Sequence, residues 1–208
     1  MRGINRGGFT LIEMLVVLAI IGVITGIMFS SQSSFNKSLV LANTAYDIAL
    51  TIRSAETFGL GSRASGNITN VGYGVHFTKG NSFILFADTD PSPNSSNCHN
   101  LPPSGNSSAP DAKPGDCKYT VGNDSLIQTY TIGNGMTVSG LCADSTCSIS
   151  SLDIVFARPN PDAFIRANGV GTTAYSKACI TITSSQGGSH YITVTTAGQI
   201  NASASSCS

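Results

Sequence analysis

Two hydrophobic patterns divide the chain, and the first is a continuous apolar segment near its start. Residues 9–29 are almost entirely apolar, and Glu13 is the only formally charged side chain among them. At 1.5 Å rise per residue this segment would span about 30 Å as a helix, which matches the hydrocarbon core of a bilayer. Because a carboxylate is costly inside a membrane segment, we expect Glu13 to have a partner of opposite charge.

The second pattern is amphipathic and follows the apolar segment. Apolar side chains recur every three or four residues, as expected for one face of a helix that covers a core. They are Leu41, Ala45, Ile48, Ile52 and Ala55. Gly59 and Gly61 then supply a stop signal. The pattern predicts one long helix from about Thr10 to Phe58, with residues 9–29 in lipid and residues 30–58 packed on a globular domain.

Residues 59–208 carry short alternating segments typical of strands, separated by turns rich in glycine and asparagine. The predicted strands cover residues 71–77, 83–87, 119–121, 125–132, 136–141, 152–157, 179–183 and 191–195. His76 lies among polar neighbours of the first strand, which favours a surface or edge histidine over a catalytic one. The expected fold class is α+β, with the helix packed on an antiparallel β domain.

A long proline-rich loop is predicted at residues 88–117, which hold six of the eight prolines of the chain. We expect a disulfide between Cys98 and Cys117 to close it. Asp88, Asp90 and Asn94 offer oxygen ligands for calcium, but the segment lacks the glycine and the bidentate glutamate of an EF-hand loop. A solvated turn is therefore favoured over a metal site.

Composition narrows the classes of function. The 208 residues have a formal net charge of zero, with 11% charged and 41% hydrophobic positions, so nucleic acid is not an expected partner. The even number of cysteines favours disulfides in an exported domain, since no CxxC pair supports a zinc site. The candidates are Cys98, Cys117, Cys142, Cys147, Cys179 and Cys207, with Cys142 and Cys147 placed to pair across a short loop.

The first eight residues have the character of a leader. Arg2 and Arg6 precede the apolar segment, which predicts a cytoplasmic N-terminus and an exported C-terminal domain. A conventional signal peptide is the alternative, because small residues also follow the apolar segment, but this segment is longer than the usual signal core.

The residues Gly8-Phe9-Thr10-Leu11-Ile12-Glu13, followed by the apolar residues 14–22, closely resemble the class III signal of type IV pilins and type II secretion pseudopilins. The resemblance implies that a prepilin peptidase cleaves between Gly8 and Phe9, removing residues 1–8, and that Phe9 is then N-methylated. It also implies that Glu13 contacts the N-terminal amine of a neighbouring subunit. The expected location is the bacterial inner membrane, with a single pass, and then a pilus or pseudopilus. The implied partners are other pilins or pseudopilins and an inner-membrane assembly platform.

The globular part resembles the minor pseudopilins and minor pilins of the GspH/FimT type. This resemblance is carried by Arg53 near the helix end, by the run from Phe156 to Pro161, and by Ile192, Val194, Gly198 and Ile200 near the C-terminus. It implies a helix followed by a two-sheet, pilin-like β domain. Within the apolar helix, Gly22 and Gly26 form a GxxxG spacing that could let another helix approach closely.

Enzyme signatures are absent from the sequence. There is no phosphate-binding GxxxxGK[ST] loop, no HExxH and no GxSxG, so neither catalysis nor a cofactor is expected. The expected function is that of a structural or priming subunit, a minor pilin or pseudopilin. The alternative is a binding module at a pilus tip, either an adhesin or a DNA receptor. Some relatives of the FimT type bind DNA through basic residues near the C-terminus, and the corresponding residues 198–201 contain no arginine, which weighs against a DNA receptor.

Overall fold

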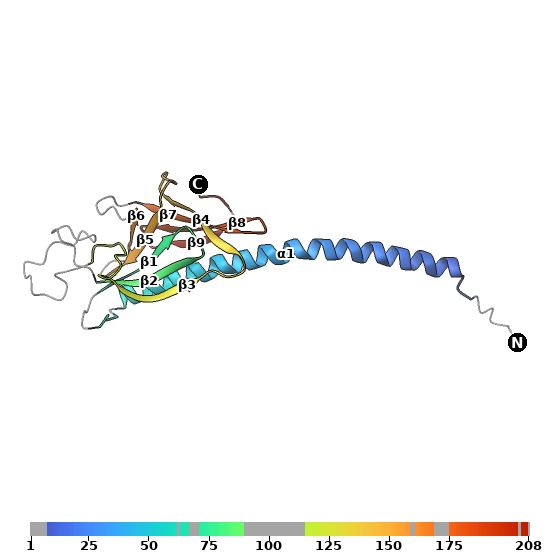
Figure 1. The fold of residues 1–208 in the computed structure, drawn as a ribbon, viewed down its shortest axis with the longest axis horizontal. Coiled ribbons are helices and arrows are strands. Elements are labelled where there is room, and N and C mark those ends of the chain that lie inside the picture. Colours follow the sequence, from blue (N-terminus) through green and yellow to red (C-terminus); the bar gives the residue numbers. More distant parts are fainter. Residues whose placement is uncertain are drawn as a thin grey trace, which may run out of the picture. The chain divides into compact units, whose positions relative to one another are not determined.

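The computed structural model describes residues 8–61, 63–66, 71–89, 115–158, 161–168, 175–203 and 205–207. The chain forms two units, residues 1–40 and residues 41–208. A single helix, α1 (Leu11–Leu60), contributes to both (Figure 1). The prediction of one long helix is therefore confirmed, and the helix ends two residues later than expected. Its last turn leads into Gly61, whose N–H donates to the Thr57 carbonyl at 2.9 Å.

The second half of α1 is the helical layer of the globular unit. The predicted apolar stripe is buried, each of its members being at most 5% exposed. It comprises Leu41, Ala45, Ile48, Ile52 and Ala55. Because all five side chains join the main hydrophobic core, this half of the helix is fixed by burial of one face.

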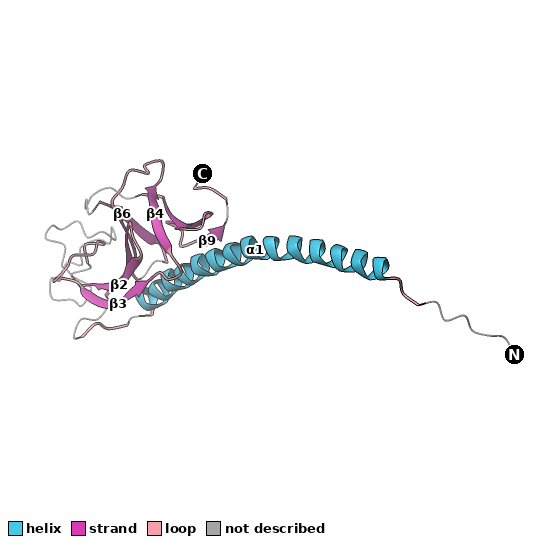
Figure 2. Ribbon diagram, turned by 45° about the vertical axis from the view of Figure 1, so that its right-hand side comes forward, coloured by secondary structure: helices cyan, strands magenta, loops and turns pink. Residues whose placement is uncertain are grey.

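In the part of the chain that the structure describes, nine strands form two antiparallel sheets, and together with α1 they confirm the α+β class (Figures 1 and 2). The first sheet has the order β3-β2-β1-β5-β6 and the second β4-β7-β8-β9. The bounds are β1 (Gly72–Thr78), β2 (Ser82–Asp88), β3 (Ser125–Thr131), β4 (Met136–Ala143), β5 (Ser151–Phe156), β6 (Ala163–Ala167), β7 (Lys177–Ser184), β8 (Ser189–Thr195) and β9 (Ile200–Ser203). Backbone hydrogen bonds between Gly80 and Val138 join the two sheets.

Each sheet buries one face in the common core, as the alternation of side chains along a strand requires. In β1 the buried set is Tyr73, Val75 and Phe77, and in β7 it includes Ala178, Ile180 and Ile182. The opposite face of the five-stranded sheet carries a second, smaller cluster built on Phe86, Cys117 and Val155. The segment after the long loop therefore covers this outer face.

Two strand predictions differ from the structure. Residues 119–121 form no strand, because Tyr119 packs against the small cluster on the outer face of the sheet instead of joining a ladder. Strand β6 was not predicted. It pairs with β5 and places Ile165 opposite Ile154 in the core, while Phe164 and Arg166 lie on the outer face.

The close approach of α1 to β5 gives a testable consequence at Gly59. A Cβ atom at this position would lie 2.2 Å from the carbonyl oxygen of Phe156, a backbone atom that cannot move aside cheaply. We expect Gly59→Ala to lower the free energy of unfolding by about 1–3 kcal/mol, the usual cost of overpacking. Denaturant unfolding followed by tyrosine fluorescence measures it, since the chain has no tryptophan.

Gly133→Ala is the matched control, because a Cβ at Gly133 meets no atom within 4 Å and the residue is not in the left-handed region. The control should unfold at the midpoint of the unaltered protein. Equal midpoints for both variants would contradict the contact between Gly59 and Phe156.

Candidate functional site

The start of α1 is the first element of the candidate site. Thr10 precedes the helix, and its hydroxyl oxygen accepts a hydrogen bond from the Glu13 N–H at 3.3 Å. The Thr10 carbonyl accepts from the Met14 N–H at 3.3 Å. Thr-x-x-Glu is the sequence of a capping box, and an acidic residue in the first turn also favours the helix dipole. Thr10 therefore sets where the helix begins, and Glu13 lies in its first turn, four residues from Phe9.

The apolar part of α1 is exposed along its whole length. Residues Leu11–Phe29 have a mean hydropathy of 2.6 with none of the segment buried, which is long and apolar enough to cross a membrane. The Thr25 hydroxyl donates to the Ile21 carbonyl, so this polar group is satisfied within the helix. A Cβ at Gly22 or Gly26 meets no described atom within 4 Å, and the packing of another helix at this GxxxG spacing stays a prediction.

A cluster of acidic side chains lies where the long loop rejoins the sheet. Carboxylate oxygens of Asp88, Asp116 and Asp124 all lie within 4.8 Å of one another. Asp88 is 2% exposed and accepts backbone hydrogen bonds from Asp116 at 3.1 Å and Cys117 at 2.7 Å. Asp124 accepts from the N–H groups of Thr89 at 2.8 Å and Thr120 at 2.7 Å. The two carboxylates thus hold the two ends of the loop together.

Burial has an electrostatic cost in this cluster. Desolvation raises the pKa of Asp88 well above its ordinary value, and the nearby charge of Asp124 raises it further. The expectation of a solvated turn is therefore wrong for Asp88, while Asp90 and Asn94 lie outside the described residues. The three carboxylates could hold a cation. Asp88 and Asp124, however, accept hydrogen bonds from backbone N–H groups, which gives them a structural role.

His76 differs from its prediction as a surface or edge residue. It lies on β1, the central strand of its sheet, and its Nδ1 is 2.6 Å from Oδ1 of Asp153. The same oxygen accepts the Tyr119 N–H at 3.2 Å, and the rings of His76 and Tyr119 lie 5.2 Å apart. Asp153 is 1% exposed, so the pair anchors the covering segment to the outer face of the sheet.

Arg166 lies beside this pair, directly opposite Asp153 on β6. Its side chain is buried, and Nη1 has no hydrogen-bond partner within the described part of the chain. Desolvation lowers the pKa of Arg166, and the charge of Asp116 opposes that shift. The outer face of the five-stranded sheet therefore combines a small apolar cluster with buried charges of both signs.

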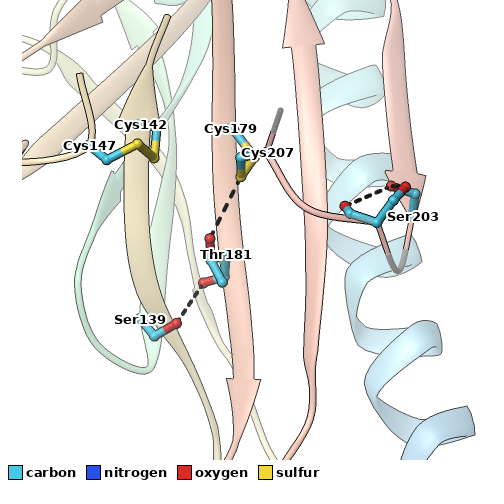
Figure 3. The surroundings of a disulfide bond; sticks show 8 residues. Ser139, Cys142, Cys147, Cys179, Thr181, Ser203 and Cys207 are labelled. Carbon is cyan, nitrogen blue, oxygen red and sulfur yellow. Dashed lines mark hydrogen bonds between the residues drawn. A yellow bond between two sulfur atoms is a disulfide. The ribbon is translucent and has the colours of Figure 1, made fainter. Parts of the chain in front are cut away.

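Disulfides reinforce the four-stranded sheet (Figure 3). One joins Cys142 to Cys147, the pairing expected from the sequence, and another joins Cys179 to Cys207. Cys117 is also disulfide-bonded, whereas Cys98, its expected partner, lies outside the described residues. The even cysteine count was thus a sound indication of disulfides.

Asp144, in the turn between Cys142 and Cys147, is a residue that no sequence pattern indicated. Its carboxylate accepts hydrogen bonds from the Ser176 hydroxyl at 2.6 Å and from the Lys177 N–H at 2.9 Å. The hydrogen bond from the Ser176 hydroxyl contributes most to lowering the pKa of Asp144, and the backbone hydrogen bonds from Ser176 and Lys177 lower it further. Asp116, Asp124 and Asp153 were missed as well, because the contacts that bring them to Asp88 or His76 join residues far apart in the sequence.

Comparison with known proteins bears on the start of the chain. Residues 4–29 match the prokaryotic N-terminal methylation motif. Neither the curated proteins nor the solved structures contain a match. The motif indicates a protein of the type IV pilin or pseudopilin kind, and with the apolar helix it fits a membrane-anchored single-pass protein.

Proposed function

We propose that the chain is a minor pilin or pseudopilin, a structural or priming subunit of a type IV pilus or a type II secretion pseudopilus. The observation that carries the proposal is the methylation motif at residues 4–29, whose residues 11–29 form the apolar part of α1 with Glu13 in the first turn. The role as a minor subunit rests on the resemblance of the β domain to GspH/FimT-type subunits.

In this proposal a prepilin peptidase cleaves between Gly8 and Phe9, and the new amine of Phe9 is methylated. The amine is cationic and lies at the membrane surface, while Glu13 lies in the first helical turn. Pairing Glu13 with the Phe9 amine of a neighbouring subunit lowers the desolvation cost of both charges. Other pilins or pseudopilins and an inner-membrane assembly platform are the partners, and Gly22 and Gly26 provide a place for close helix packing.

Glu13→Gln tests the charge pair. Glutamine keeps the size and the capping-box chemistry of Glu13 and removes only its charge. A charged hydrogen bond contributes about 1.5–3 kcal/mol, so we expect incorporation into filaments to fall about tenfold or more. The measurement compares the chain in sheared filaments with the chain in membranes, where its amount should not change.

Thr10→Ala is the matched control, because it removes the cap of α1 and leaves the charge of Glu13 in place. The proposal expects this variant to keep most of its incorporation. Normal incorporation of Glu13→Gln would rule out the charge pair, and an equal loss in both variants would assign the effect to helix capping.

A further inference from the structure

Cys142 and Cys179 lie directly opposite each other on the neighbouring strands β4 and β7. The flanking residues Leu141, Ala143 and Ile180 point into the main core. Alternation along the strands therefore places both cysteines on the outer face of the four-stranded sheet. Two disulfides thus begin at adjacent positions on one surface (Figure 3).

Each of these two cysteines is bonded to a sulfur that lies outside β4 and β7. Cys147 lies five residues beyond Cys142, and Cys207 lies 28 residues beyond Cys179 in the C-terminal tail. The strand cysteines are buried, with 8% exposure for Cys142 and 3% for Cys179. Cys147 is exposed and Cys207 is half-buried. An external thiol therefore reaches the outer sulfurs first.

The register also permits a third pairing. Residues directly opposite each other in an antiparallel pair have Cα atoms about 4.5–5.5 Å apart, and disulfides span Cα separations of about 4.4–6.8 Å. A bond between Cys142 and Cys179 thus needs rotation of the side chains and no movement of the strands. Each observed disulfide uses one of the two buried sulfurs, and the cross-strand bond would use both, so it can form only when the observed disulfides are broken.

We propose that Cys142, Cys147, Cys179 and Cys207 form one thiol–disulfide exchange site, which takes a thiolate of the glutathione class. The external thiolate attacks Sγ of Cys147, forms a mixed disulfide there and releases the thiolate of Cys142. The Cys142 thiolate then attacks Sγ of Cys179, forms the cross-strand disulfide and releases the thiolate of Cys207. Each step makes one S–S bond and breaks one, so no further oxidant or reductant is required.

The exchange couples the Cys142–Cys147 loop to the C-terminal tail. Cys179–Cys207 ties the tail to β7, and Sγ of Cys207 lies 3.8 Å from the Thr181 hydroxyl. Attack at the exposed loop therefore frees the tail and uncovers the outer face of β7. This inference rests on the register and the burial of the cysteines, and it does not depend on the role of the chain in a filament.

The test treats the full-length protein, purified in detergent, with reduced glutathione, followed by acid quenching and non-reducing peptide mapping. We expect the mixed disulfide at Cys147 to accompany a Cys142–Cys179 peptide and a free thiol at Cys207. A mixed disulfide at Cys147 with a free thiol at Cys142 and an intact Cys179–Cys207 bond would overturn the proposal.

Two single variants should each form the Cys142–Cys179 bond, one by attack of the Cys179 thiol and the other by attack of the Cys142 thiol. Cys207→Ser leaves Cys179 as a thiol that can attack Cys142, and Cys147→Ser leaves Cys142 as a thiol that can attack Cys179. Both should yield the Cys142–Cys179 peptide, with the free thiol at Cys147 in the first and at Cys207 in the second. Retention of the original second disulfide in both variants would contradict the exchange.

Discussion

A Gly8→Val chain should accumulate at its precursor mass, with no mature form. The proposed peptidase must approach the carbonyl between Gly8 and Phe9 closely, and a β-branched side chain both narrows the backbone conformations and blocks that approach. A Cβ at Gly8 meets no described atom within 4 Å, and α1 begins only at Leu11. The substitution therefore leaves the fold unaffected and acts on recognition alone. Intact-mass spectrometry of the membrane fraction distinguishes the precursor from the cleaved, methylated chain.

Gly3→Val is the matched control, since it adds the same side chain five residues before the expected scissile bond. This control should be processed like the unaltered protein. The normal mature mass in the Gly8→Val chain would show that processing does not depend on Gly8 and would contradict the prediction. A precursor in both variants would show instead that the leader as a whole is sensitive to bulk.

The parts of the fold that depend on local pattern could be predicted from the sequence. The stripe from Leu41 to Ala55 repeats every three or four residues because one helix face meets the core, and all of its predicted members are buried. The β1–β2 hairpin was predicted for a similar reason, since Val75 and Phe77 alternate with polar or small residues. In both cases the residues that carry the signal are close neighbours in the chain.

The missed features depend on contacts that are distant in the sequence. Tyr119 has a high strand propensity, yet it contacts Phe86 and His76 across the sheet and forms no strand. Strand β6 is short, and it is a strand because β5 supplies its partner. No local pattern could indicate that β1 lies between β2 and β5.

The same division applies to the candidate site. Residues 8–13 form a continuous motif, so their expected role could be proposed from the sequence, and the capping bond between Thr10 and Glu13 adds a local structural reason for the motif. The acidic cluster could not be predicted, because Asp88 meets Asp116 and Asp124 only after the long loop returns. The facing position of Cys142 and Cys179 likewise follows from the β4–β7 register.

Asp88 should make the globular unit more stable at acidic pH. Its folded-state pKa is raised, first by desolvation and then by the charge of Asp124, so the folded protein binds a proton more tightly than the unfolded chain. The resulting stability is fully present below the ordinary pKa near 3.8 and is lost as the pH rises through the raised folded-state pKa. Between those two values one proton changes the free energy of unfolding by at most about 1.4 kcal/mol per pH unit.

The Asp88→Asn variant isolates this contribution. Asparagine cannot ionise, and it has one acceptor oxygen for the two N–H groups of Asp116 and Cys117. We therefore expect the variant to be less stable than the unaltered protein at pH 4, with a difference that shrinks as the pH rises. Taking the difference at each pH removes the contributions of other titrating groups that the two proteins share. Urea unfolding of the full-length protein in detergent, followed by tyrosine fluorescence, measures both profiles.

Asp144→Asn provides a control of opposite sign. Hydrogen bonds from Ser176 and Lys177 lower the pKa of Asp144, so its stabilisation is present above the ordinary carboxyl pKa and is lost as the pH falls through the lowered value. For this variant the difference from the unaltered protein should grow as the pH rises toward 3.8 and stay constant above it, whereas for Asp88→Asn it should shrink. Differences that change in the same direction would show that Asp88 is not a destabilised carboxylate. Opposite trends would show that the buried Asp88 carboxyl group, which joins the two ends of the loop, makes the folded protein less stable as the pH rises.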